Sequence, residues 1–118
     1  VFIESFRSRY TADREVLEKA RDRFKAEGFE VSGCVTTTMV GKISTGWNLI
    51  SCYTNEDTQN QLQEIFEYTA SVFDEIMIDD FLFTDCECEE CQKARGHKTW
   101  ADYRCDLMTE ISRVGINK

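Results

Sequence analysis

The sequence lacks several features that would point to particular classes of protein. It has no proline and no apolar stretch that approaches the ~20 residues of a membrane-spanning helix. No glycine-rich phosphate loop follows any of its apolar segments, which disfavours a nucleotide-binding protein. Basic residues are scarce, with 14 against 22 acidic residues and a formal net charge of -8. Because nucleic-acid phosphates attract lysine and arginine, this balance disfavours nucleic acid and predicts neutral or cationic ligands.

The sequence also lacks a starting methionine and a recognisable signal peptide. It opens on the apolar segment VFIESF and stops at GINK, where a predicted helix ends. We therefore expect residues 1–118 to be one segment of a longer protein, without separate domains. The compartment stays open: zinc-bound cysteines would favour the cytoplasm, whereas disulfides would favour a secreted or periplasmic protein.

What the sequence does contain is an alternation of strand-like and helix-like segments. Strands are expected at 1–6, 29–37 and 73–83, and helices at 12–27, 54–70 and 99–114. The first helix is expected to be capped by Thr11, and the second by Thr54 or Asn55. The order β-α-β-α-β-α predicts an α/β fold of parallel βαβ units, either a doubly wound sheet or a slice of a (β/α)8 barrel.

Three acidic residues fall at the expected carboxyl ends of strands, where α/β proteins collect functional groups. Glu4 follows VFI, and Asp79 and Asp80 follow EIMI. Neighbouring strand residues point to opposite faces, so only one of the two aspartates can enter a pocket, where it could pair with Glu4. A structural role is the alternative, in which Asp79 caps a turn or pairs with Arg7 or Arg9.

Aromatic residues near the same ends are candidates for stacking on sugar rings. Trp47 lies in the long loop 38–51, Tyr53 follows that loop, and Phe81 follows the aspartates. Phe81 could equally pack beneath the loop that comes after it. The run of threonines at 36–38 is interpreted as a β-forming sequence without a functional hydroxyl.

Half of the six cysteines are concentrated in one short segment, C-x-C-x-x-C. Cys86, Cys88 and Cys91 present three sulfurs where Zn²⁺ requires four ligands. The fourth ligand would come from elsewhere, and the candidates are Cys52, Cys34, Cys105 and His97. A disulfide within the segment and three free thiols are the alternatives.

Four segments together resemble the middle of a (β/α)8 glycoside hydrolase barrel: SCYTNEDTQ, FDEIMIDDFLF, CECEEC and TWADYR. They are similar to the β-galactosidases of glycoside hydrolase family 42 and related uncharacterised glycosidases. The resemblance implies about three of the eight βα units of a TIM barrel. It also implies a structural zinc held by Cys52, Cys86, Cys88 and Cys91.

The sequence departs from that family at the catalytic position. Family 42 enzymes end the fourth strand with Asn-Glu, whose glutamate is the general acid/base. Aligned on Asp79, these positions are Asp80 and Phe81, so the glutamate is missing. We therefore expect Asp80 to be the acid/base or a substrate-binding carboxylate, with Asp79 and Glu4 as supporting rim residues.

The sequence thus predicts a segment of a glycoside hydrolase that acts on a carbohydrate. Its partner would be the remainder of its own barrel, and a homo-oligomer stays open. The alternative is a non-enzymatic α/β module, stabilised by zinc, that binds a carbohydrate or a protein. A redox module is a weaker third hypothesis, because no helix is expected directly behind the cysteines to lower a thiol pKa.

Overall fold

The computed structural model describes residues 1–116, and the side chains of residues 1–113. The chain forms an α/β fold with a mixed four-stranded sheet and four helices. In chain order the elements are β1 (Phe2–Arg7), β2 (Tyr10–Thr11), α1 (Arg14–Ala26), β3 (Ser32–Val35), α2 (Glu56–Val72), β4 (Ile76–Ile78), α3 (Glu89–Arg95) and α4 (Trp100–Ile116). None of these helices combines the length and the apolarity that a membrane span requires.

The sheet has the strand order β2-β1-β3-β4. β1, β3 and β4 are parallel, as predicted, but β2 is antiparallel to β1, so the prediction of a purely parallel sheet is wrong. The reversal occurs at Ser8 and Arg9, which both take left-handed backbone angles, with φ of 44° and 70°. A two-residue turn with positive φ at both positions matches the twist of a hairpin. Such turns usually contain Asn-Gly or Asp-Gly, so the Ser-Arg pair found here gives no sequence signal for the turn.

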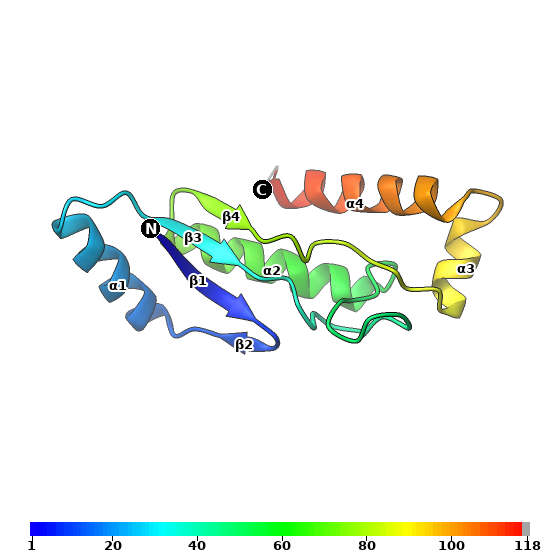
Figure 1. The fold of residues 1–118 in the computed structure, drawn as a ribbon, viewed down its shortest axis with the longest axis horizontal. Coiled ribbons are helices and arrows are strands. Elements are labelled where there is room, and N and C mark those ends of the chain that lie inside the picture. Colours follow the sequence, from blue (N-terminus) through cyan, green and yellow to red (C-terminus); the bar gives the residue numbers. More distant parts are fainter. Residues whose placement is uncertain (117–118) are drawn as a thin grey trace.

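The helices α1 and α2 pack against the parallel strands, and α4 packs beside α2 (Figure 1). Each βα unit advances by one strand in the same direction, from β1 to β3 and from β3 to β4. The opposite face of the sheet carries Phe2, which is 58% exposed, and Met77, which is 38% exposed. Among the described residues nothing covers this face or pairs with the free edge of β4.

The core lies between the sheet and α2. Val35 of β3 and Leu62 of α2 are fully buried in its larger cluster. α2 can approach β3 closely because Gly33 has no side chain, and a Cβ there would lie 2.6 Å from the ring of Phe73 and 2.8 Å from Thr69. Truncating a buried leucine such as Leu62 typically costs about 2–5 kcal/mol, so this interface supplies much of the stability.

Several boundaries differ from the sequence prediction. β4 has three residues in place of the eleven expected, because Phe73 is still the C-cap of α2 and Asp79 ends the strand. The carboxylate of Asp79 accepts a hydrogen bond from the Asp80 backbone N–H at 2.8 Å, which turns the chain out of the sheet. Asn55 caps α2 as predicted, whereas α1 is capped by Asp13 and not by Thr11.

Candidate functional site

Two groups of functional side chains lie toward the carboxyl ends of the parallel strands. α3 and the loops beside it lie at the end of the molecule toward which β1 and β3 point (Figure 1). We call the four cysteines Cys52, Cys86, Cys88 and Cys91 the cysteine corner. We call Glu4, Thr36, Asp79 and Asp80 the carboxylate rim.

The cysteine corner brings four sulfur atoms together, all within 4.8 Å of one another. The Sγ atoms of Cys52, Cys88 and Cys91 are separated by 3.6 Å in each pair. A disulfide would need about 2.05 Å, so these three sulfurs are unlinked. Four sulfurs placed ~2.3 Å from a central ion in a tetrahedron lie about 3.8 Å apart, and the observed spacing fits such a set.

Local structure explains how the four thiols converge. Cys52 lies just before the N-cap of α2, and Cys91 lies in the first turn of α3. The helix α3 was not predicted, and Cys88 is its N-cap residue. The other candidate ligands, Cys34, Cys105 and His97, lie outside the group. The ring of Trp100 packs against the cysteines and closes the corner on the side of α4.

The thiols differ in acidity because of their surroundings. Burial raises the pKa of Cys52 well above its ordinary value and that of Cys91 to about 11. Burial also acts on Cys88, but hydrogen bonds from the Cys91 backbone N–H and from neighbouring thiols outweigh it and lower its pKa to about 6. Because metals bind the deprotonated thiolate, Cys88, the least buried of the four cysteines, is the one whose lowered pKa favours binding of a cation.

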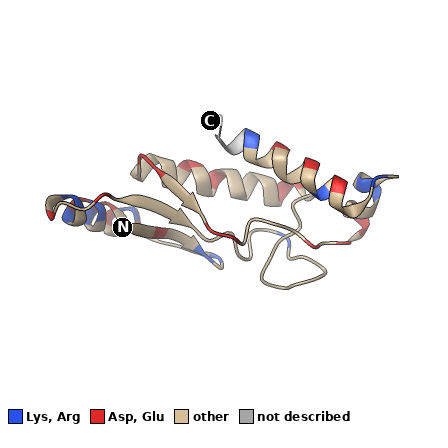
Figure 2. Ribbon diagram, turned by 45° about the horizontal axis from the view of Figure 1, so that its top comes forward, with Lys and Arg blue, Asp and Glu red and all other residues tan. Residues whose placement is uncertain are grey.

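Positive charge surrounds the cysteine corner. The Lys42 Nζ lies 3.4 Å from the Cys88 Sγ. The guanidinium groups of Arg95 and Arg104 both stack on the Trp100 ring, at 4.4 and 4.8 Å from its centroid. Figure 2 shows basic and acidic residues side by side near α3, and two of these basic residues are paired, Lys42 with Glu90 and Arg104 with Glu87. Cations here offset the negative charge that four thiolates would bring to a divalent ion.

The carboxylate rim joins three neighbouring strands. Thr36 and Asp79 directly follow the ends of β3 and β4, but Glu4 lies within β1, paired in register with Cys34, so the prediction that it ends its strand is wrong. The Thr36 hydroxyl donates to the Glu4 carboxylate and lies 3.3 Å from the Asp79 Oδ2. Arg7 binds the same Glu4 carboxylate through its Nε at 3.0 Å. The expected pairing of Glu4 with one of the aspartates thus occurs through a threonine, and Asp79 is the aspartate involved. The interpretation of the threonine run as merely β-forming misses this role of Thr36.

The two aspartates of the rim differ. Asp79 accepts the Asp80 backbone N–H, and this bond is the first cause of its lowered pKa, so its carboxyl stays ionised to a lower pH than an ordinary aspartate. An ionised carboxylate accepts hydrogen bonds and is poorly suited to donate a proton. The Asp80 side chain is exposed.

The predicted sugar-stacking residues are distributed between surface and core. Trp47 is 43% exposed, and its ring lies 5.8 Å from that of Phe81 and 6.3 Å from that of Phe83. These three rings form an aromatic cluster on the surface. Tyr53 is fully buried and packs in the core beside Val35, so it presents no face to a ligand in this structure.

Sequence reasoning missed several polar residues that support these groups. Asp85 accepts hydrogen bonds from the Ser44 hydroxyl at 2.5 Å and the Trp47 backbone N–H at 2.9 Å. Thr54 lies 3.1 Å from the Cys91 Sγ, and Thr45 lies 3.8 Å from the Cys86 Sγ. The only available signal was the length of loop 38–51, which marks it as functional without naming any residue.

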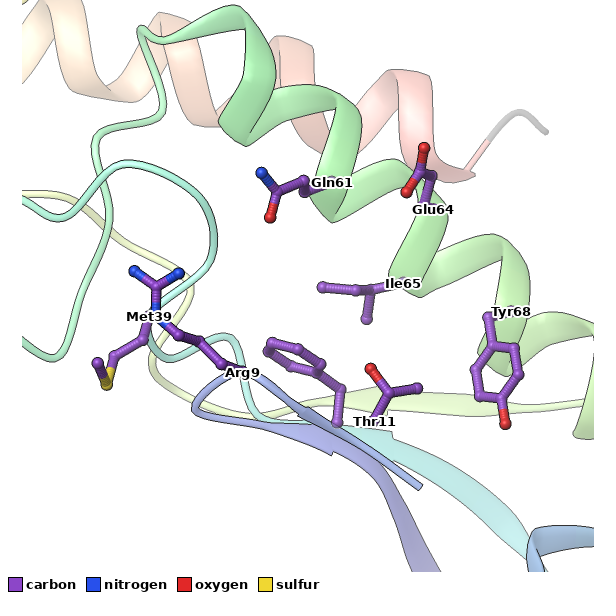
Figure 3. A pocket seen from close by; sticks show the side chains of 8 residues that line it. Arg9, Thr11, Met39, Gln61, Glu64, Ile65 and Tyr68 are labelled. Carbon is purple, nitrogen blue, oxygen red and sulfur yellow. The ribbon is translucent and has the colours of Figure 1, made fainter. Parts of the chain in front are cut away.

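A hollow of about 410 Å³ lies elsewhere, between the β1–β2 hairpin and α2. Figure 3 shows Gln61, Glu64 and Tyr68 along α2 on one side, and Arg9 and Thr11 of the hairpin on the other. None of the predicted site residues lines it. The chemistry expected from the sequence therefore belongs to the strand ends and not to this hollow.

Comparison with known proteins identifies the family. Residues 1–117 match the model of a family described as "Probable glycosyl hydrolase, catalytic domain", and the chain belongs to this family. It is 29% identical over 97 residues to the uncharacterized protein SSO3021 of Saccharolobus solfataricus. That match covers 76% of this chain and 16% of the relative, so the chain spans a small part of the relative's length. No solved structure matches the chain.

Proposed function

We propose that this member of the glycosyl hydrolase family is part of a (β/α)8 barrel and contributes three strand ends to the active site of a carbohydrate-hydrolysing enzyme. The observation that carries the proposal is the carboxylate rim. Glu4 and Asp79 come from different strands and meet through Thr36 at the carboxyl edge, which is where barrel enzymes place their catalytic groups.

The arrangement of the sheet supports the barrel. A barrel needs consecutive parallel strands that advance in one direction, with the helices outside. β1, β3 and β4 advance in this way, α1 and α2 pack on the strands, and α4 packs beside α2. The uncovered face, with Phe2 and Met77, would then be the barrel interior. About three of the eight βα units would lie in these residues, with a family 42-like order of motifs.

Within such a site each residue would have a separate role. Asp80 would be the general acid/base, and the rest of the barrel would have to bury it, since an acid in this role needs a raised pKa. Asp79, held ionised, and Glu4 would accept hydrogen bonds from sugar hydroxyls. Trp47 and Phe81 would stack on a sugar ring, and Tyr53 would support them from the core. The second carboxylate would come from a later strand.

The cysteine corner would hold a structural Zn²⁺. The residues fit this ion, because four sulfurs at tetrahedral spacing satisfy zinc completely and leave no open position for substrate. Bound zinc would supply folding energy and no chemistry. All four ligands of the corner come from this chain, which also favours the second candidate, a zinc-stabilised module that binds a carbohydrate or a protein. The uncovered apolar face of the sheet argues against such a self-contained module.

The test is Asp80→Asn in the full-length protein, assayed on aryl glycosides with good and poor leaving groups. Loss of a general acid typically costs 10²–10⁴-fold, and we expect the larger loss on poor leaving groups because they depend on protonation. Asp74→Asn is the matched control, since Asp74 is fully exposed at the opposite, amino end of β4. Undiminished hydrolysis by Asp80→Asn would remove Asp80 from the mechanism.

A further inference from the structure

Three residues that are not cysteines each place a hydrogen-bonding group beside a different sulfur of the cysteine corner. The Lys42 Nζ lies 3.4 Å from the Cys88 Sγ, and the Thr54 Oγ1 lies 3.1 Å from the Cys91 Sγ. The Thr45 Oγ1 lies 3.8 Å from the Cys86 Sγ. Lys42 and Thr45 both come from the long loop that carries Trp47. Side chains that bind metal-ligating atoms in this way fix the position of the ligands.

We propose that metal loading of the cysteine corner positions the tip loop, residues 44–50, and with it the ring of Trp47, and that Thr45 is the positioning residue that transmits this coupling. The inference rests on the metal site proposed above. It adds that the metal, although closed to substrate, determines where a part of the proposed sugar-binding surface lies.

The backbone hydrogen bonds show which part of the loop depends on the corner. The stem is held by backbone contacts on both sides, because the Lys42 backbone N–H donates to the Thr58 hydroxyl of α2 at 2.9 Å and its carbonyl accepts the backbone N–H of the corner residue Cys52 at 2.8 Å. The tip loop closes on itself through the Ser44 N–H, which donates to the Ile50 carbonyl at 3.0 Å. Residues 45–49 beyond this closure are all exposed.

One backbone bond from outside, from the Met39 N–H to the Leu49 carbonyl at 2.8 Å, holds the end of the tip loop, and the contacts of residues 44–47 lead to residues 85–87. The Thr45 hydroxyl accepts the Glu87 backbone N–H at 2.8 Å, which leaves its own proton free to point at the Cys86 sulfur. Asp85 accepts from Ser44 and from the Trp47 N–H. Residue 46 must be glycine, since a Cβ there would lie 2.3 Å from the Asp85 carboxylate. The metal ligand Cys86 thus lies between the two residues that hold the tip loop.

The charge of the metal site explains why loading should hold the tip loop more firmly. Four thiolates around a divalent ion carry a net charge of about -2, and an anion strengthens each hydrogen bond that it accepts. A neutral thiol at position 86 attracts the Thr45 hydroxyl weakly, whereas a metal-bound thiolate attracts it strongly. Lys42, which also pairs with Glu90 at 2.9 Å, offsets part of the charge at Cys88 from the fixed stem.

The experiment uses the full-length protein, stripped of metal and reloaded with Zn²⁺, and measures amide hydrogen exchange in the peptide that covers residues 44–50. In the wild type we expect loading to slow exchange of the tip loop by about tenfold or more. In Thr45→Val, which keeps the shape and loses the hydroxyl, loaded protein should keep fast exchange in the tip loop. Thr45→Ser should restore the protection.

The control variant is Thr109→Val, which loses a hydroxyl that donates to the Cys105 carbonyl on α4, away from the corner. It should exchange in the tip loop as the wild type does. Comparing the loaded forms alone keeps the test valid even where stripped protein unfolds. Equal tip-loop exchange in loaded wild type and loaded Thr45→Val would overturn the coupling. Failure of the protein to take up Zn²⁺ would overturn the metal site itself, with the hydrolytic proposal still standing on Asp80.

Discussion

The cysteine corner and the carboxylate rim lie at the same end of the sheet but differ in completeness. The corner collects four ligands from two segments of this chain and encloses them with Trp100. The rim joins Glu4 and Asp79 through Thr36, and its third carboxylate, Asp80, is exposed. A structural metal site needs only ligands that fold together locally. A catalytic pair needs carboxylates from strands on both sides of a substrate, so one stretch of a barrel holds only part of it.

The largest expected effect breaks the corner. Cys86→Ser replaces one of four sulfurs, and we expect Zn²⁺ affinity to fall by more than the 10–100-fold typical of residues that only support ligands. Isothermal titration of stripped protein with Zn²⁺ measures this. Cys105→Ser is the control, because Cys105 is exposed and lies outside the corner. Unchanged zinc affinity in Cys86→Ser would show that the four cysteines do not form one site.

The next effect breaks the rim and leaves the corner intact. Thr36→Val removes the hydroxyl between Glu4 and Asp79, and a hydrogen bond to a charged group is worth about 1.5–3 kcal/mol. We expect the free energy of unfolding to fall by that amount in urea titration, with the zinc affinity unchanged. Thr37→Val is a closely matched control, since the Thr37 hydroxyl is buried without a partner among the described residues and its loss should cost little. Equal losses in the two variants would refute the bridging role of Thr36.

The smallest expected effect is a change in the pKa of Asp85, next to Cys86, and it tests whether the surroundings of the cysteine corner and the carboxylate rim titrate independently. Burial alone would raise the pKa of Asp85, but hydrogen bonds from Ser44 and the Trp47 N–H hold it below the ordinary value. We expect Ser44→Ala to raise the pKa of Asp85 toward ~3.9 and to leave that of Asp79 lowered, in a carboxyl NMR titration.

The direction of the Asp85 pKa shift determines the pH range in which this residue stabilises the fold. Because the pKa of Asp85 is lowered on folding, its ionisation stabilises the fold above the unfolded pKa of ~3.9, and this contribution is lost as the pH falls through the lower folded value. Ser71→Ala is the control, since that exposed hydroxyl donates to the Tyr68 carbonyl and touches no carboxylate. A shift at both aspartates in Ser44→Ala would mean that the corner and the rim are coupled.

Local patterns in the sequence were sufficient to predict α1, α2 and α4 and the short cysteine motif, but not α3. Helical spacing in 54–70 and the Asn55 cap predict α2 closely, and C-x-C-x-x-C predicts three ligands of the corner. These predictions succeed because helix contacts and ligand spacing join residues three or four positions apart. The resemblance to family 42 also agrees in kind with the glycosyl hydrolase family that the chain matches, while the family 42 assignment itself stays a prediction.

The two errors in the predicted strands, the length of β4 and the absence of β2, have a common physical origin. β4 ends early because the Asp79 side chain competes for the backbone of Asp80, a choice that strand propensity does not register. β2 depends on left-handed angles at Ser8 and Arg9, and the Ser8 N–H and hydroxyl are held by Thr38, thirty residues away. In each case a polar contact decided the local conformation.

By itself, then, the sequence predicted the alternation of strands and helices, three sulfur ligands and an aspartate, Asp79, directly after a strand. Residue spacing left the fourth sulfur ligand open among four candidates, the family resemblance selected Cys52, and the tertiary structure brings Cys52 to the other three. Only the tertiary structure decided that Glu4 lies within β1, that Thr36 and not a direct contact joins Glu4 to Asp79, and that Trp47 is exposed while Tyr53 is buried. The physical reason is the distance along the sequence between the residues that are in contact. Periodicity and spacing report contacts within one turn or one strand, whereas these arrangements join residues 32 to 43 positions apart through single hydrogen bonds or shared sulfur contacts, whose partners become neighbours only when the sheet has formed.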